Sequence, residues 1–156
     1  MQQFIRLLIV FVFFGIKPVL AEIPIVPKGI TFTCTPVAVW DGDGPVWCEE
    51  GPRIRLSGIA AREIDNVCKK HHPCPRTSGL DARDALVNLL GTPIGISRHG
   101  HILIKGAAMR CTSDGGAKGN RTAAWCVSND VDVNCTMVTN GWAFKWPKYW
   151  REHVCK

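Results

Sequence analysis

The chain has 156 residues, of which 46% are hydrophobic, and it carries a formal net charge of +6. This length predicts one domain with a single core, and no apolar stretch after residue 21 is long enough to cross a bilayer. The positive charge suits a polyanionic partner, but many solvated surfaces carry as much, so charge alone does not identify nucleic acid as the partner.

The first 21 residues have the pattern of a signal peptide. Arg6 supplies the positive start, residues 7–16 form an apolar run, and Val-Leu-Ala at 19–21 is a small-residue cleavage site. The run is shorter than the ~20 residues of a membrane span. We therefore expect a mature chain of residues 22–156, secreted or periplasmic and free of the membrane; a retained N-terminal anchor is the alternative.

All eight cysteines follow the predicted cleavage site. An even number in an exported chain predicts disulfides, and two pairs straddle turn sequences as bridged antiparallel strands would. A zinc cluster is the competing interpretation, but no Cys-x2-Cys spacing is present. Pairing neighbours predicts four bridges: Cys34–Cys48, Cys68–Cys74, Cys111–Cys126 and Cys135–Cys155.

The first half of the chain predicts strands separated by strong turns. Residues 30–40 are β-branched and apolar, and Asp-Gly-Asp-Gly-Pro at 41–45 then predicts a turn before a second strand begins at 46–48. In residues 53–59, basic or small residues alternate with apolar ones, which predicts a third strand. On this period Arg53 and Arg55 face a groove, and the residues between them face the core.

The second half predicts helices and further strands. Residues 79–90 form the clearest helix, with Ser78 as N-cap, a stripe of leucines and Gly91 as the stop. One or two strands are expected within 93–109, another at 120–127, and helices at 130–140 and 146–154. The order of these elements alone indicates an α+β, mainly β, domain.

Two arginines, a glutamate and an acidic turn lie in an order that suits phosphodiester chemistry. Arginine matches a phosphate with a planar fork of donors, and a carboxylate can take the proton from an attacking water. The segments are Asp-Gly-Asp at 41–43, Arg-Leu-Ser-Gly-Ile-Ala-Ala-Arg-Glu at 55–63 and Gly-Asn-Arg-Thr-Ala at 119–123. As a set, and with Gly-Trp-Ala at 141–143, they resemble the staphylococcal-nuclease-like (thermonuclease) family from about residue 30 to the end.

The resemblance implies a five-stranded OB-fold barrel with about three helices, stabilised by the disulfides. It also implies an exported nuclease, a hydrolase that cleaves DNA or RNA. Arg55 and Arg121 would hold the phosphate and Glu63 would assist the water. A divalent cation, calcium or magnesium, would be held by Asp43 with a weaker contribution from Asp41. The partner would be DNA or RNA, and we expect a monomer.

The chain departs from the family pattern at the metal. Ala60 replaces an aspartate ligand, and one residue is inserted between Gly119 and Arg121. The anion-handling residues are kept while the metal ligands are reduced. A catalytically inactive module that binds nucleic acid or another anion is therefore the alternative, and a disulfide-stabilised envelope protein without phosphate chemistry is a third.

Basic and aromatic residues interleave in the C-terminal segment at 142–151. They predict either a surface that stacks bases and contacts phosphates or a tail that packs on the barrel as core.

Overall fold

The computed structural model describes residues 24–155, so the predicted signal peptide lies outside the described residues. This part of the chain is mainly β, with three helices: α1 (Gly79–Leu90), α2 (Val133–Thr139) and α3 (Pro147–Trp150). The strands are β1 (Thr31–Cys34), β2 (Pro36–Val39), β3 (Val46–Cys48), β4 (Arg53–Leu56), β5 (Ile59–Ala60), β6 (Gly91–Ile96), β7 (Ile102–Gly106), β8 (Met109–Ala117), β9 (Arg121–Ser128), β10 (Val131–Asp132) and β11 (Phe144–Lys145).

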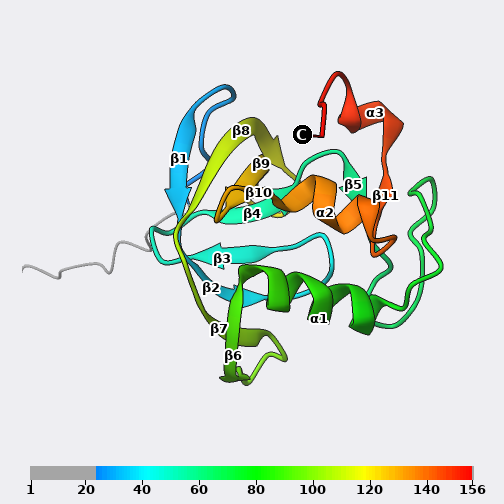
Figure 1. Ribbon diagram of the computed structural model, residues 1–156, viewed down its shortest axis with the longest axis horizontal. Helices are drawn as coiled ribbons and strands as arrows, with labels where there is room; N and C mark the ends of the chain where they lie inside the picture. Colours follow the sequence, from blue (N-terminus) through cyan, green and yellow to red (C-terminus); the bar gives the residue numbers. More distant parts are fainter. Residues whose placement is uncertain (1–23, 156) are drawn as a thin grey trace, which may run out of the picture.

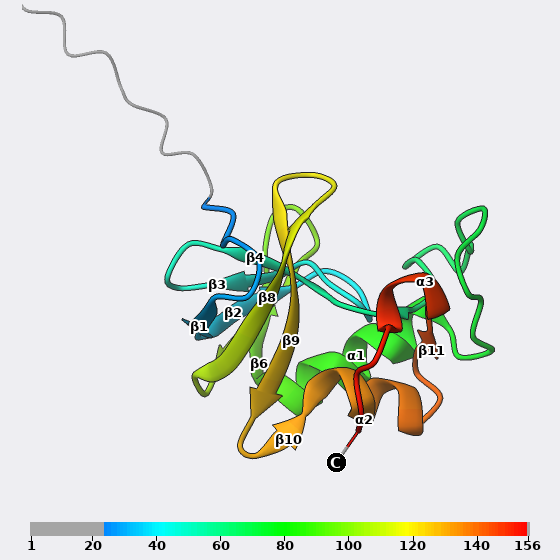
Figure 2. The same cartoon turned by 90° about the horizontal axis from the view of Figure 1, so that it is seen from above.

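One curled sheet forms most of the domain. Nine strands join it in the order β1-β8-β9-β4-β3-β2-β7-β6, with β10 added at β9, and the sheet bends into a half barrel (Figure 1). The β4–β9 pair is parallel, whereas the other pairs are antiparallel. Helices α1 and α2 lie along one side of the sheet (Figure 2), and β5 pairs with β11 in a separate small sheet.

The strands are shorter and more numerous than the five we expected. The predicted strand at 30–40 breaks at Thr35, whose N–H and hydroxyl both donate to the carboxylate of Glu50 at 2.8 Å. This break lets β1 pair with β8 while β2 pairs with β3 and β7. Strand β8 contains Cys111, which the predicted bridge places on a strand, but it continues through Ser-Asp-Gly-Gly-Ala, which has low strand propensity and was expected to form the turn.

Helix α1 confirms the prediction at 79–90. The side chain of Ser78 accepts the N–H of Asp81 at 3.1 Å, and the helix ends at Gly91. Leu86 and Leu90 are buried as expected, but Leu80 is 44% exposed and does not belong to the buried face.

The two C-terminal helices are shorter than predicted. Asp132 caps α2 by accepting the N–H of Cys135, and the residues before it form β10 instead of helix. Helix α3 stops after one turn because Arg151 takes a positive φ of 51°, which a helix does not allow.

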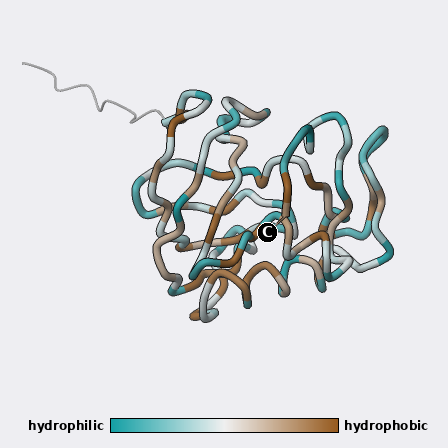
Figure 3. The backbone as a smooth tube through the Cα atoms, turned by 45° about the horizontal axis from the view of Figure 1, so that its top comes forward, coloured by the Kyte–Doolittle hydropathy of each residue, from teal (hydrophilic) through white to brown (hydrophobic). Residues whose placement is uncertain are grey.

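The core lies between the curled sheet and helices α1 and α2. In Figure 3 the strands and these helices carry the hydrophobic stretches, and the outer loops are mostly hydrophilic. The largest apolar side chains with less than 2% exposure are Ile54, Leu56, Ile59, Leu86, Met109 and Met137. Burial of each such side chain contributes about 1.5–3 kcal/mol, so this layer fixes the position of β4 and β5.

All four predicted disulfides are present: Cys34–Cys48, Cys68–Cys74, Cys111–Cys126 and Cys135–Cys155. Four bridges in a domain of this size indicate an oxidising environment, extracellular or periplasmic. In residues 24–155 no helix has the length and apolar character needed to span a membrane.

Candidate functional site

A cleft of about 740 Å³ opens where β4, the β8–β9 hairpin and the C-terminal segment meet. Its floor includes Arg55 and the Ser57–Ile59 turn, and one side is formed by residues 116–119 and Arg121 of the hairpin. On the other side lie two residues of the Cys68–Cys74 loop and the aromatic rings of the C-terminal segment. These are Lys69, His72, Trp146 and Tyr149, followed by Arg151.

The lining of the cleft is strongly cationic. Five basic side chains contribute to it, and Asp114 is the single acid among the lining residues. Three of the five lie in ion pairs that offset part of that charge: Arg151 with Asp114 at 3.5 Å, Lys69 with Glu63 at 2.7 Å and Arg55 with Asp43 at 3.0 Å. The basic residues are Arg55, Lys69, Lys118, Arg121 and Arg151. A concave surface with this excess of positive charge attracts polyanions.

The β4–β9 pairing places the two predicted arginines on one face. Arg55 is level with Ala123 in the parallel register, and Arg121 lies two residues before Ala123 on β9. Residues two apart on a strand point to the same side of the sheet, so both side chains face the cleft. The structure thus brings together Arg55 and Arg121, although they are far apart in sequence.

The guanidinium of Arg55 is held mainly by the protein itself. One terminal nitrogen donates to the carbonyls of Asp43 and Leu56 at 3.2 and 2.9 Å. The other donates to the carbonyl of Ile59 at 2.9 Å and lies 3.0 Å from the Oδ2 atom of Asp43. All the terminal N–H groups are engaged, so Arg55 acts in the cleft as a fixed charge more than as an open fork.

Arg121 keeps a more open guanidinium. Its Nε donates to the carbonyl of Lys118 at 2.7 Å, and no partner of its two terminal nitrogens is found among residues 24–155. Burial, and then the positive charge of Arg55, lower the pKa of Arg121. Its fork is therefore open to receive a phosphate.

The acidic turn is buried beneath the cleft, outside its lining. Asp41 is 5% exposed and Asp43 8% exposed. The Oδ1 atom of Asp41 accepts the N–H of Asp43 at 3.2 Å, and the Oδ2 atom of Asp43 accepts the N–H of Ala61 at 2.9 Å. Burial, and then the negative charge of Asp43, raise the pKa of Asp41 to about 8.

Glu63 stands beside the cleft without lining it. Its carboxylate lies 2.7 Å from Nζ of Lys69, which does line the cleft. The neighbouring Arg62 does not line the cleft, because its guanidinium donates to the carbonyls of Pro75 and Asn66 at 2.7 Å and holds the intervening loop. Of the predicted catalytic residues, the two arginines meet in the cleft and Glu63 borders it.

The carboxylates present fit a calcium ion poorly. Calcium takes 6–8 oxygen ligands, whereas the Oδ2 atom of Asp43 already serves Arg55 and an amide. Within residues 24–155, groups of three ligand atoms close enough to share an ion involve disulfide-bonded cysteines and none of Asp41, Asp43 or Glu63.

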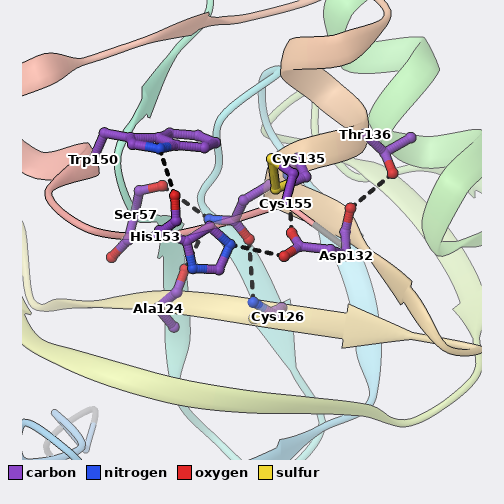
Figure 4. Close-up of polar contacts among 10 residues, drawn as sticks. Ser57, Ala124, Cys126, Asp132, Cys135, Thr136, Trp150, His153 and Cys155 are labelled. Carbon is purple, nitrogen blue, oxygen red and sulfur yellow. Dashed lines mark hydrogen bonds and ion pairs between the residues drawn. A yellow bond between two sulfur atoms is a disulfide. The ribbon is translucent and has the colours of Figure 1, made fainter.

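A set of contacts around the C-terminus anchors the aromatic side of the cleft (Figure 4). The backbone carbonyl of His153 accepts the indole N–H of Trp150 at 2.8 Å. The ring of His153 stacks on Trp125 with centroids 3.8 Å apart. The Cys135–Cys155 disulfide then ties the end of the chain to α2. These contacts position the preceding residues, so part of the tail packs as core while part faces the cleft.

Sequence reasoning missed some of the cleft residues. Lys69 and His72 reach it from the Cys68–Cys74 loop, where the ring of His72 packs at a tilt against Trp146 with centroids 4.1 Å apart. Burial, and then the charge of Arg55, lower the pKa of His72. Lys118 was also missed. For Lys69 and His72 the sequence did contain one signal, a run of basic residues inside a short disulfide loop near Glu63.

No family model matches this chain, and no curated protein matches it. A functional assignment therefore depends on the geometry of the cleft and on the motif residues within and beside it.

Proposed function

We propose that the protein is an exported, monomeric OB-type domain that binds a strand of DNA or RNA in its cationic cleft. The observation that carries this proposal is the lining of the cleft, where five basic side chains and a single acid surround a volume of about 740 Å³. Neutralising phosphates releases their counterions, which supplies most of the affinity of sequence-independent binding.

Aromatic rings beside the cations favour a single strand over a duplex. Trp146 and Tyr149 line the cleft in an edge-to-face pair with ring centroids 4.7 Å apart, and the ring of His72 lies 4.1 Å from that of Trp146. Unpaired bases stack on such rings regardless of sequence, and stacking contributes about 1–3 kcal/mol per base. A duplex keeps its bases stacked on one another and gains nothing from these rings.

The test is fluorescence anisotropy with labelled single-stranded DNA and RNA and the oxidised chain 22–156, over a series of salt concentrations. We expect Arg121→Ala to lower affinity about tenfold and to reduce the salt slope by ~0.7, the share of one phosphate contact. Arg98→Ala is the control, because the substitution removes the same charge at a site away from the cleft. Arg98 is exposed on the β6–β7 turn and does not line the cleft. Equal losses in both variants would mean that the cleft is not the binding site.

Hydrolysis of the bound strand is a second candidate, favoured by the position of Glu63. Its carboxylate contacts a lysine of the cleft at 2.7 Å and is 26% exposed, so a water held near the bound phosphate can reach it. In this reaction Glu63 takes the proton of water, the oxygen forms a bond to phosphorus, and the bond to the leaving oxygen breaks. Arg121 would stabilise the added negative charge on the phosphoryl oxygens.

A gel assay of cleavage tests this second candidate with calcium, magnesium or a chelator present. Glu63→Gln should abolish cleavage and leave binding in place, and Glu49→Gln on the exposed β3–β4 turn is the matched control. Binding without cleavage by the unsubstituted protein would leave only the binding function. Absence of both would favour an envelope protein without phosphate chemistry.

A further inference from the structure

The floor of the cleft already contains a fixed positive charge. Arg55 is 13% exposed, and its terminal nitrogens are held by three backbone carbonyls and the carboxylate of Asp43. Asp43 is held in turn by the N–H of Ala61. The Arg55–Asp43 ion pair therefore holds the guanidinium in one orientation at the floor of the cleft. No bound metal is needed to orient it.

A divalent ion bound to Asp43 would compete with this arrangement. On the Oδ2 atom of Asp43 it would have to share or replace the Arg55 contact at 3.0 Å, and this oxygen also accepts an amide; on the other oxygen of the same carboxylate it would still lie beside the guanidinium. Two positive charges so close together repel each other strongly in a partly buried setting. Ala60 stands where the family pattern has an aspartate ligand, and neither it nor Ala61 supplies a carboxylate side chain in its place.

We propose that anion binding in this cleft needs no divalent metal, because the guanidinium of Arg55 occupies the position of the cation. Asp43 is then a positioning residue for Arg55. This inference rests on the proposed nucleic-acid binding and specifies how that site works: Arg55 supplies a permanent charge at the floor, and Arg121 supplies the open fork.

Two measurements test it. The first is anisotropy with a labelled single-stranded DNA in EDTA, calcium or magnesium at constant ionic strength. We expect the affinities in the three buffers to agree within about twofold. This corresponds to a difference in binding free energy below about 1 kcal/mol. Binding that disappears in EDTA would overturn the inference while leaving the proposed function intact. No binding in any buffer would overturn the proposed function itself.

The second measurement is the effect of calcium alone on the midpoint of thermal unfolding. The unsubstituted protein should show no shift, whereas Arg55→Ala, which frees the Asp43 carboxylate beside Asp41, should gain a stabilisation that rises with calcium concentration. A shift in the unsubstituted protein that is as large as in the variant would contradict the inference. Arg98→Ala is the control for loss of charge.

Arg55→Lys covers the case in which Arg55→Ala does not fold. Lysine keeps the charge but cannot make the same set of forked contacts. We expect it to bind DNA without metal, about tenfold more weakly than the unsubstituted protein, because the charge is no longer held in one orientation. Binding by Arg55→Lys that is as tight as binding by the unsubstituted protein would count against the inference, because the forked contacts of Arg55 would then contribute nothing.

Discussion

Asp132 joins the last residues of the chain to α2 through both of its carboxylate oxygens. The Oδ1 atom accepts the N–H of Cys135 at 2.9 Å, and the Oδ2 atom lies 2.8 Å from Nε2 of His153 (Figure 4). Because Trp146, Tyr149 and Arg151 line the cleft and shortly precede His153, this one carboxylate links the helix cap to the aromatic side of the cleft.

Replacing Asp132 with alanine should cost more stability than replacing His153. Asp132→Ala removes the cap, which contributes about 0.5–2 kcal/mol, and it also leaves the imidazole without its partner. His153→Ala removes the same contact and the stacking on Trp125, but it leaves the cap in place. The partly exposed ring contributes less than the cap and the orphaned imidazole together. Urea unfolding under non-reducing conditions measures both variants, and a smaller loss in Asp132→Ala than in His153→Ala would contradict the assignment of the cap.

Removal of the Cys135–Cys155 disulfide and removal of the Cys68–Cys74 disulfide should affect stability and DNA binding differently. Cys135–Cys155 spans 20 residues, and its removal by a pair of serine substitutions should cost about 3 kcal/mol from loop entropy. Cys68–Cys74 spans 6 residues, so its removal should cost less stability. It should nevertheless weaken DNA binding, because the loop carries Lys69 and His72 into the cleft. Thermal unfolding and anisotropy on both double variants separate the two effects.

Local signals in the sequence were sufficient to predict some elements and not others. Helix α1 was predicted within its bounds because Ser78, a leucine stripe and Gly91 are all signals contained in the segment itself. The break at Thr35 depends on Glu50, a contact between distant residues that no pattern in residues 30–40 reveals. The four disulfides were predicted because each pair consists of neighbouring cysteines.

The site shows the same division between local and distant information. The resemblance predicted that Arg55 and Arg121 share one site, and the β4–β9 pairing puts both side chains in the lining of the cleft. The use of the Arg55 donors by three carbonyls could not be predicted, since it depends on how the Asp43 turn folds under β4. The contribution of Lys69 likewise depends on the fold of a disulfide loop.

Two glycines with similar backbone angles should respond differently to alanine. Gly58 has φ of 70° and its Cα faces the ring of Trp125 and the backbone of Trp150, whereas Gly141 has φ of 73° and open space around it. Gly141→Ala should cost only the backbone strain, about 1 kcal/mol. Gly58→Ala adds a clash with Trp125 and should cost about 1–3 kcal/mol more. Equal losses in chemical denaturation would mean that Trp125 moves freely away.

The buried carboxyl of Asp41 should make the protein less stable as the pH rises. Its pKa is raised from 3.8 to about 8 by burial and by Asp43, so the folded state keeps a proton that the unfolded state has lost between these two values. In this window the unfolded state binds fewer protons, and the free energy of unfolding falls with increasing pH. Below about pH 4 the Asp41 carboxyl is protonated in both the folded and the unfolded state, so it no longer makes the free energy of unfolding depend on pH.

Asp41→Asn should remove this dependence, because an amide stays neutral at every pH and can still accept the N–H of Asp43. We expect the variant to gain stability relative to the unsubstituted protein at pH 7 and to gain little at pH 4. Urea unfolding at both pH values measures the difference. A difference between the two proteins that is constant from pH 4 to pH 8 would show that Asp41 ionises normally in the folded state.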